Sequence, residues 1–412
     1  MTISKDGRSS SRKGGWAGAL ALAYVTSVAL GGATLLSPLF PTYEEEKYLT
    51  GFLITVIFAV YVVGALGMMW LGESLSRKFG RKPLLIVALG LVLIADVLYY
   101  MAGGVALLTL GRLLSGAGVG VFVAIGSLAI IDQLDDDRTE AGSLTAATGT
   151  VLGLAAGSII SGYFATQFAD TLHSPYLVHI AAVLLAFIAM VFVAPTVAVD
   201  RDRTIDYALP RIPDSVRAVF IPSAIAAFGA FSVGGFFGAV APAFVTEILD
   251  VRSPFAIGLI ASLVFGFAAV GNFVNLKLPE SYAPLAGALI LLVGVCVLGV
   301  GLYIASLASI CIGAAIAGLG DGLALQAGLN AIKREASDED ETEAVTLFFM
   351  ICYSALAIPI LLAGVVELIV DLQTTAVGFA VAVALLLVAA ILLLWRNLRN
   401  VGENAADSRE QA

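Results

Sequence analysis

The chain has 412 residues, of which 59% are hydrophobic and 13% are charged, and its formal net charge is −9. Soluble domains usually carry about 25% charged residues, and a soluble chain of this length could not hide so many apolar side chains from water. The composition therefore excludes a water-soluble globular protein and indicates a protein whose solvent is lipid.

Twelve apolar runs follow one another along the chain. A helix needs about 20 mostly apolar residues to cross a bilayer, and the runs are solid rather than alternating, which favours helices over membrane strands. We therefore predict an all-α membrane protein. Its spans are expected at residues 14–39, 50–71, 83–101, 104–131, 140–166, 175–194, 217–247, 254–276, 282–303, 305–331, 342–366 and 373–395. The first run is too long for a signal-peptide core, so we expect it to be retained.

The densest positive charge lies in "SRKFGRKPLL", between spans two and three, where four cations fall between Arg77 and Lys82. Cytoplasmic loops of membrane proteins carry excess Lys and Arg. When the gaps are assigned alternately to the two sides, starting inside, the outer gaps receive only Lys47 and Arg252. We predict that both chain ends are cytoplasmic, in a multi-pass protein of the plasma membrane.

Spans three and four each carry an ionisable residue. Asp96 comes eight residues before Gly104 and Arg112 eight residues after it, so a turn at Gly104 places both at a similar depth, roughly 10 Å below the outer surface. A charge inside a bilayer is unfavourable and marks a functional candidate. Two interpretations stay open, a proton-sensitive ion pair and a structural clasp of the hairpin.

Small residues recur every four positions along span five, at Gly149, Gly153 and Gly157, and the glycine-rich stretch continues to Gly162. This spacing lets two helices approach closely. Static packing and a sliding gate are both compatible with it.

The chain contains an internal repeat. "GRLLSGAGVGVFV" from Gly111 aligns with "GAAIAGLGDGLAL" from Gly313, with four glycines at a constant offset of 202. Parallel six-span repeats are typical of transporters that bind substrate between their halves. The predicted divisions are a cytoplasmic tail at 1–13, a six-helix bundle at 14–194, a cytoplasmic linker at 195–216, a second six-helix bundle at 217–395 and a cytoplasmic tail at 396–412.

Span ten carries a carboxyl group, Asp321, where its repeat partner is Val119. Burial disfavours the charged form of a carboxylate, so we predict a protonation site there; a hydrogen-bonded structural carboxyl is the alternative. An aromatic, partly polar cavity would suit lipophilic substrates, although the phenylalanines of span seven equally suit a packed core. The predicted cavity residues are Tyr24, Phe231, Gln326 and Asn330.

Four motifs between Ser37 and Gly162 resemble those of the major facilitator superfamily, and the chain looks like a member over nearly all its length. "FGRKPLL" resembles the second half of its signature loop, "GRLLSGAGVG" its span-four motif, "GTVLGLAAGSIISG" its span-five antiporter motif and "SPLFP" the end of its first span. The resemblance implies two six-helix repeats and a proton-coupling position for Arg112. It also implies a cavity lined by spans one, four, seven and ten. The residues that the resemblance places in a gating loop are Glu73, Arg77, Gly80, Arg81 and Lys82.

The chain departs from the family pattern twice. Arg77 stands where the signature loop carries an Asp, with Glu73 as the substitute acid, and Gly157-Ser158 stands where the span-five motif has Gly-Pro. The missing proline leaves an uptake transporter open beside an antiporter.

Acidic residues occur in runs, at Glu44–Glu46, Asp135–Asp137 and Asp338–Glu341. An acid-rich surface stays hydrated at molar salt, where screening is strong. We interpret the runs as the mark of a salt-loving, haloarchaeal source; ordinary acidic loops are the alternative.

No P-loop or other enzyme motif was found, so energy is expected to come from an ion gradient or from the substrate's own gradient. We predict a secondary transporter, not an enzyme, that exports a drug or metabolite in exchange for protons. The alternatives are an uptake symporter or facilitator for a sugar or organic acid, and a non-transporting sensor or scaffold. The expected partners are a small-molecule substrate, protons or another coupling ion, and the lipid bilayer. We expect a monomer without cofactor, metal or nucleic acid.

Overall fold

The computed structural model describes residues 14–46, 49–196, 199–202, 204–205, 207–337 and 340–410, and the predicted tail at 1–13 lies outside this range. Every regular element of the described residues is helical. The elements are α1 (Gly15–Thr34), η1 (Ser37–Leu39), α2 (Phe40–Glu45), α3 (Gly51–Phe79), α4 (Arg81–Tyr100), α5 (Val105–Val121), η2 (Phe122–Gly126), α6 (Ser127–Ile131), η3 (Asp136–Arg138), α7 (Thr139–Gln167), α8 (Ser174–Ala189), η4 (Met190–Phe192), α9 (Arg217–Ala239), α10 (Ala241–Glu247), α11 (Pro254–Asn275), α12 (Ala283–Tyr303), α13 (Leu307–Glu335), α14 (Glu341–Glu367) and α15 (Leu372–Glu410).

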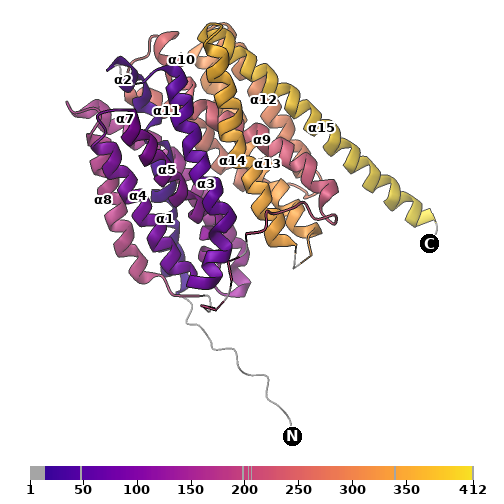
Figure 1. The fold of residues 1–412 in the computed structure, drawn as a ribbon. Coiled ribbons are helices and arrows are strands. Elements are labelled where there is room, and N and C mark those ends of the chain that lie inside the picture. The colour runs from indigo at the N-terminus through magenta and orange to yellow at the C-terminus, as the bar shows by residue number, and fades with distance from the viewer. Residues whose placement is uncertain are drawn as a thin grey trace.

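Twelve stretches of the described chain are long and apolar enough to cross a membrane. This finding confirms the predicted all-α membrane fold and its span count. The helices run alternately up and down and stand side by side (Figure 1).

Several helices extend further than their apolar runs, and α15 continues from the predicted span end at 395 to Glu410. The second span was predicted to end at residue 71, but α3 continues to Phe79 and α4 begins at Arg81. The basic stretch is therefore a helix–helix corner rather than a loop. Gly80 forms the corner at φ +91°, a conformation that a residue with a side chain rarely adopts. In the same way α13 reaches Glu335, four residues beyond the predicted end at 331.

Prolines interrupt two spans near one end of the bundle. The first span breaks into α1, η1 and α2, where Pro38 and Pro41 each begin a short helix. The seventh breaks at Val240, and Pro242 begins α10. Proline has no backbone N–H to continue an α-helical ladder, which accounts for both breaks.

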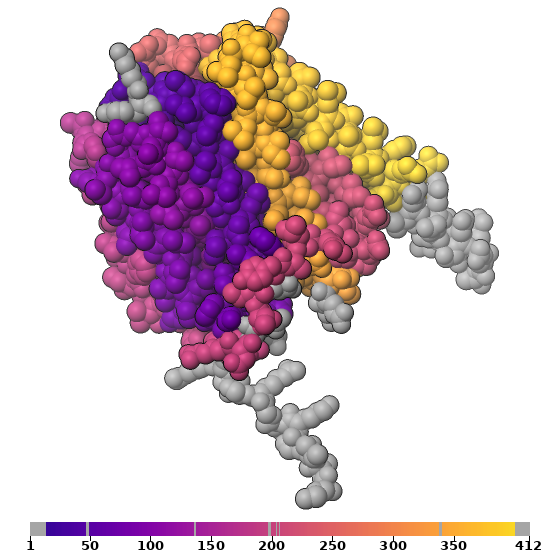
Figure 2. All heavy atoms as spheres, in the orientation of Figure 1, coloured from indigo at the N-terminus to yellow at the C-terminus, as the bar shows by residue number. Residues whose placement is uncertain are grey.

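The helices form two groups, α1–α8 and α9–α15, referred to below as the N-half and the C-half. They meet where α3 packs on α14 and where α7 packs on α11. Figure 2 shows the indigo surface of the N-half against the orange surface of α14 along a continuous seam. We call the end of the bundle with Arg81 and Arg334, where α1 begins and α15 ends, the basic end; α2 and α10 lie at the opposite end (Figure 1).

The halves are tightly packed at the opposite end. A Cβ on Gly364 of α14 would lie 3.0 Å from Cβ of Thr55 on α3. A Cβ on Gly162 of α7 would lie 2.3 Å from the carbonyl oxygen of Pro254 on α11. The largest cluster of buried apolar side chains draws on both halves there. At Gly162 this close approach of two backbones is possible only because the position lacks a side chain.

Candidate functional site

Asp321 is the central residue of the 29-residue helix α13. Its side chain is 9% exposed, and among the described residues its buried Oδ1 has no hydrogen-bond partner. It lies close enough to Cys352 of α14 to interact with that thiol electrostatically. A buried carboxyl group without a partner is strongly disfavoured in its charged form. The position is therefore suited to a carboxyl that is neutral in this conformation.

Glycines on either side of Asp321 hold α13 close to its neighbours. A Cβ on Gly320 would lie 2.3 Å from the backbone nitrogen of Leu291 on α12, and one on Gly322 would lie 2.0 Å from the carbonyl oxygen of Ala268 on α11. The helix is clamped on both sides, so the carboxyl group sits in a rigid setting.

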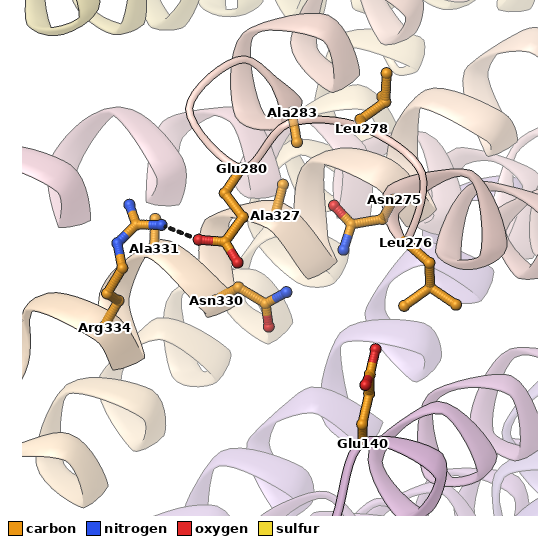
Figure 3. Close-up of a pocket in the computed structure, with 10 residues that line it drawn as sticks. All are labelled: Glu140, Asn275, Leu276, Leu278, Glu280, Ala283, Ala327, Asn330, Ala331 and Arg334. Carbon is orange, nitrogen blue, oxygen red and sulfur yellow. Dashed lines mark hydrogen bonds and ion pairs between the residues drawn. The ribbon is translucent and has the colours of Figure 1, made fainter.

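A pocket of about 180 Å³ lies at the basic end, between the halves (Figure 3). Glu140 of α7 faces it from the N-half, and Asn275 of α11 and Asn330 of α13 from the C-half. Beside them Arg334 donates to Glu280 over 2.7 Å. The lining is polar and mixed in charge, as expected for an opening to water rather than for a lipophilic binding site.

The predicted cavity residues do not gather at one place. Asn330 lies in the pocket at the basic end and accepts a hydrogen bond from Gln326 one turn away, over 3.3 Å. Tyr24 of α1 donates to the carbonyl of Ala182 on α8, over 3.1 Å. It lies on the seam between those two helices.

Phe231 lies between the halves, with its ring centroid 5.8 Å from that of Tyr353 on α14. Phe231 packs against the apolar cluster of the N-half and also against that of α9, α13 and α14. Tyr353 in turn meets Tyr61 of α3. These rings form an aromatic wall at the junction, which suits an apolar ligand.

Arg112 of α5 is completely buried. It donates to the carbonyl of Ala33 on α1 over 2.7 Å. Its guanidinium carbon lies 5.6 Å from the ring centre of Phe58 and 5.7 Å from those of Phe40 and Tyr61. Within the described part of the chain, Nε and Nη2 make no hydrogen bond. Aromatic faces attract a cation, and more strongly when water is excluded.

Asp96 does not form the ion pair with Arg112 that matching depth suggested. Its Oδ2 lies 2.7 Å from Nδ1 of His179 on α8. Nε2 of the same ring lies 2.9 Å from the carbonyl oxygen of Val28 on α1. Equal depth places two side chains at the same level in the bundle but does not fix the direction in which each one points around its helix. Asp96 points from α4 toward α8. His179, which we did not predict as a site residue, joins the first, third and sixth spans.

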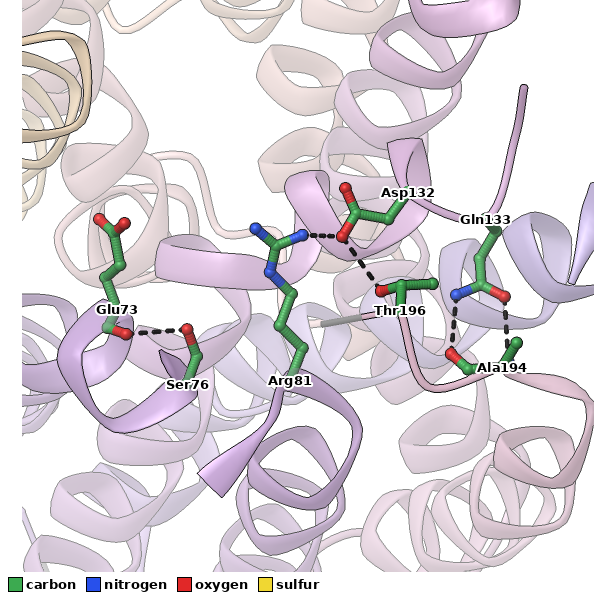
Figure 4. A network of polar contacts seen from close by, with 7 residues as sticks. All are labelled: Glu73, Ser76, Arg81, Asp132, Gln133, Ala194 and Thr196. Atoms are coloured by element: carbon green, nitrogen blue, oxygen red, sulfur yellow. Dashed lines mark hydrogen bonds and ion pairs between the residues drawn. The ribbon is translucent and has the colours of Figure 1, made fainter. Parts of the chain in front are cut away.

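The predicted gating residues tie the α3–α4 corner to the rest of the N-half (Figure 4). Arg81 pairs with Asp132 at the end of α6, and Thr196 donates to the same carboxylate over 3.0 Å. Lys82 donates to the carbonyl of Val193 over 2.7 Å. Arg77 pairs within α3, one turn away, with Glu73. Within the described residues, the ion-pair partner of Glu73 is therefore Arg77 of the same helix and not a residue of the C-half.

The glycines of span five serve two interfaces. A Cβ on Gly153 or Gly157 would lie 2.4 or 2.1 Å from a carbonyl oxygen of α1, whereas Gly149 has its nearest neighbour at 3.4 Å. Gly162 instead meets Pro254 of the C-half. Among the described residues, no cluster of three His, Cys, Asp or Glu side chains could hold a metal ion.

Curated relatives include an exporter, an uncharacterised transporter and a multidrug resistance protein. The chain is 30% identical over 156 residues to the bacillibactin exporter of Bacillus subtilis, which is 35% of this chain and 39% of that one. It is 24% identical over 269 residues to the uncharacterized MFS-type transporter YtbD of the same species, covering 63% of this chain and 64% of that one. It is 34% identical over 83 residues to the multidrug resistance protein MdtL of Escherichia coli O45:K1, covering 20% and 21%. The matches therefore span less than two thirds of each relative.

A solved structure shares the fold over almost the full length. It is a bacterial homologue of the human lysosomal transporter Spinster, in an inward-facing and unoccupied conformation. The TM-score is 0.71 at 14% identity, over 92% of this chain and 96% of that chain. The sequence model of the Major Facilitator Superfamily matches residues 22–278, more than half of the chain. Together with the twelve spans and their two-half arrangement, this match shows that the chain belongs to the Major Facilitator Superfamily.

Proposed function

We propose that this transporter exports small lipophilic molecules in exchange for protons, by alternating access across a prokaryotic plasma membrane. The observation that carries the proposal is Asp321, a buried carboxyl group at the centre of α13 with an unpartnered oxygen. Its neutral form is compatible with the apolar surroundings, and its charged form requires a cation or water. A proton and a cationic substrate can therefore compete for the carboxyl group of Asp321.

The conformation supports a cycle that opens to one side at a time. Toward the opposite end the halves make close contacts, Gly364 with Thr55 and Gly162 with Pro254. The mixed-charge pocket lies between the halves at the basic end. Because cytoplasmic loops are rich in Lys and Arg, we propose that the basic end, with both chain ends, faces the cytoplasm. The chain would then be open to the inside, ready to accept a molecule for export.

The direction of transport is supported by two further features. The printed names of two relatives describe an exporter and a multidrug resistance protein. Phe231, Tyr353 and Tyr61 pack together at the junction of the halves. Movement of the halves apart would expose this apolar surface to lipophilic molecules, which gain free energy by leaving water.

The test measures accumulation of lipophilic cationic dyes in cells that express the wild type or Asp321→Asn, with and without a protonophore. The wild type should exclude a dye, and the protonophore should abolish exclusion. Asp321→Asn should raise accumulation to the level of cells without the protein, because an amide cannot exchange a proton. Glu335→Gln is the matched control on the same helix, since Glu335 is exposed at its end, and exclusion should persist.

Two outcomes would count against the proposal. If dye exclusion survives Asp321→Asn at equal expression, the carboxyl group is structural. If the wild type excludes no dye, uptake of sugars and organic acids becomes the function to measure. Transport of neither class would favour a sensor or scaffold.

A further inference from the structure

His179 has a hydrogen-bond acceptor against each ring nitrogen. Nδ1 faces the carboxyl of Asp96 at 2.7 Å and Nε2 faces the carbonyl of Val28 at 2.9 Å. The two side chains are 8% and 1% exposed. A backbone carbonyl can only accept, so Nε2 must carry a hydrogen.

Counting protons then fixes the state of the pair. With Nε2 protonated, Nδ1 and the carboxyl oxygen need one proton between them, on either atom. Without it, two lone pairs would face each other at 2.7 Å in a buried site, which is strongly unfavourable. The geometry therefore describes a pair that holds one shared proton and is neutral overall.

Loss of that proton forces a choice. A neutral imidazole carries one N–H. It can donate either to Asp96 on α4 or to Val28 on α1, but not to both. Because a hydrogen bond to a carboxylate is about twice as strong as one to a neutral acceptor, the hydrogen should stay on Nδ1. The contact between His179 and α1 is then lost.

The groups around the pair do not decide which nitrogen of His179 carries the hydrogen. Tyr99 of α4 interacts with both Asp96 and Arg112. From α8, Tyr176 packs against Tyr99 with the rings tilted and their centres 5.4 Å apart, and its hydroxyl hydrogen-bonds with that of Tyr43 on α2. In the part of the chain that the structure describes, the pair interacts directly with no charged group outside itself.

The α1 segment held by His179 is connected to other elements. Gly32 leaves room for the ring, since a Cβ there would lie 3.0 Å from Cε1 of His179. The carbonyl of Ala33 accepts from Arg112 of α5. Thr34 donates to Leu154 of α7 over 2.8 Å, and α7 packs on α11 of the C-half. A shift of this segment would reach the interface between the halves.

We propose that Asp96 and His179 form a proton-binding site of the N-half, whose occupancy determines whether His179 of α8 holds the carbonyl of Val28 on α1. The Asp96–His179 pair would be a second proton-binding site besides Asp321, and the use of this site in transport rests on the proposed function. Binding of the proton to this pair does not rest on the proposed function, because protonation can be measured without any substrate.

The experiment is ¹⁵N-histidine NMR of the purified full-length protein as pH is raised. The chain has two histidines, so His173→Gln leaves His179 as the sole signal. Both ring nitrogens should be protonated or hydrogen-bonded at first, and should then shift in one step that leaves the hydrogen on Nδ1. In Asp96→Asn the step should move to lower pH, because the carboxylate no longer attracts the proton.

A second pair of variants keeps the test decisive if Asp96→Asn fails to fold. Gly32→Ala should displace the ring and shift the step without removing a titratable group. Gly90→Ala on α4 meets open space and should leave it unchanged. Absence of a step while the protein stays folded, or a step that neither Asp96→Asn nor Gly32→Ala moves, overturns the site. A normal step beside failed dye export would instead count against the proposed function alone.

Discussion

At the scale of single residues, Arg112 stands out because it forms no ion pair with any residue that the structure describes. Its guanidinium has one backbone acceptor and three aromatic faces. Buried ionic groups are seldom the most stabilising choice for their position, and apolar replacements of similar volume are often neutral or stabilising. Such a group is better explained by a task in the transport cycle than by stability.

Replacing Arg112 should separate stability from transport. Arg112→Met keeps an unbranched chain of similar length that packs among Phe40, Phe58 and Tyr61. We expect the free energy of unfolding in detergent to be unchanged or raised by about 1 kcal/mol, and dye export to be lost. Thermal unfolding and export would be measured on the same preparation. A large loss of stability with export retained would show that Arg112 is a structural residue.

The residue scale is also where the sequence predicted least. The sequence matched Asp96 with Arg112 because both lie at a similar depth. His179 lies at a similar depth too, since it is five residues after the start of α8 and Asp96 is four residues before the end of α4. The choice among partners at equal depth depends on the rotation of each helix. In a span that is apolar all round, no polar face reveals that rotation.

At the scale of elements, the sequence predicted spans more accurately than helices. Hydropathy marks the part of a helix that lies in lipid. It located all twelve spans but ended several of them too early, including the second, the tenth and the twelfth. The extra turns of α3 and α13 are polar and project beyond the apolar region. Helix ends are set by local partners such as Gly80, and apolar content does not report them.

The repeat continues into those extra turns with reversed charges. The offset of 202 that aligns the fourth and tenth spans carries Asp132 onto Arg334. Asp132 pairs with Arg81 at the start of α4, and Arg334 pairs with Glu280 just before α12. Each half therefore fastens the corner between its second and third spans to the end of its fourth. The backbone symmetry is kept while the signs are exchanged.

The glycines of α7 allow a prediction at this scale. In Gly157→Ala the new Cβ would lie 2.1 Å from the carbonyl oxygen of Gly31, and backbone cannot move aside as a side chain can. We expect the free energy of unfolding to fall by about 1–3 kcal/mol. Gly149→Ala on the same helix meets nothing nearer than 3.4 Å and should change it by less than about 0.5 kcal/mol. Equal unfolding temperatures for the two variants would contradict close packing of α1 on α7.

At the scale of the whole molecule, the sequence predicted the architecture but not the conformation. Composition, the repeat at an offset of 202 and the basic corner sufficed for twelve spans in two halves. Which end is closed depends on contacts such as Gly364 with Thr55, between residues more than 300 positions apart. Alternating access requires the same chain to pack in two ways. The sequence must therefore be compatible with both, and no local pattern can indicate one.

A reversible cross-link at the closed end would test whether the halves must separate there. Cysteines at Thr55 and Gly364, in a protein whose three native cysteines are replaced, would have Cβ atoms 3.0 Å apart. This separation is close to the distance of about 3.5–4.5 Å that a disulfide spans. Oxidation should abolish dye export and a reductant should restore it, because the disulfide holds the opposite end shut.

The matched control places the disulfide inside one half. Cysteines at Gly299 of α12 and Ala380 of α15 would have Cβ atoms 3.3 Å apart, both within the C-half. Rigid-body movement of one half against the other leaves that distance unchanged, so oxidation of this pair should not affect export. Export that persists when the Thr55–Gly364 pair is fully cross-linked would mean that the opposite end need not open. The transport path would then have to leave the bundle elsewhere, and alternating access between these two halves would be wrong.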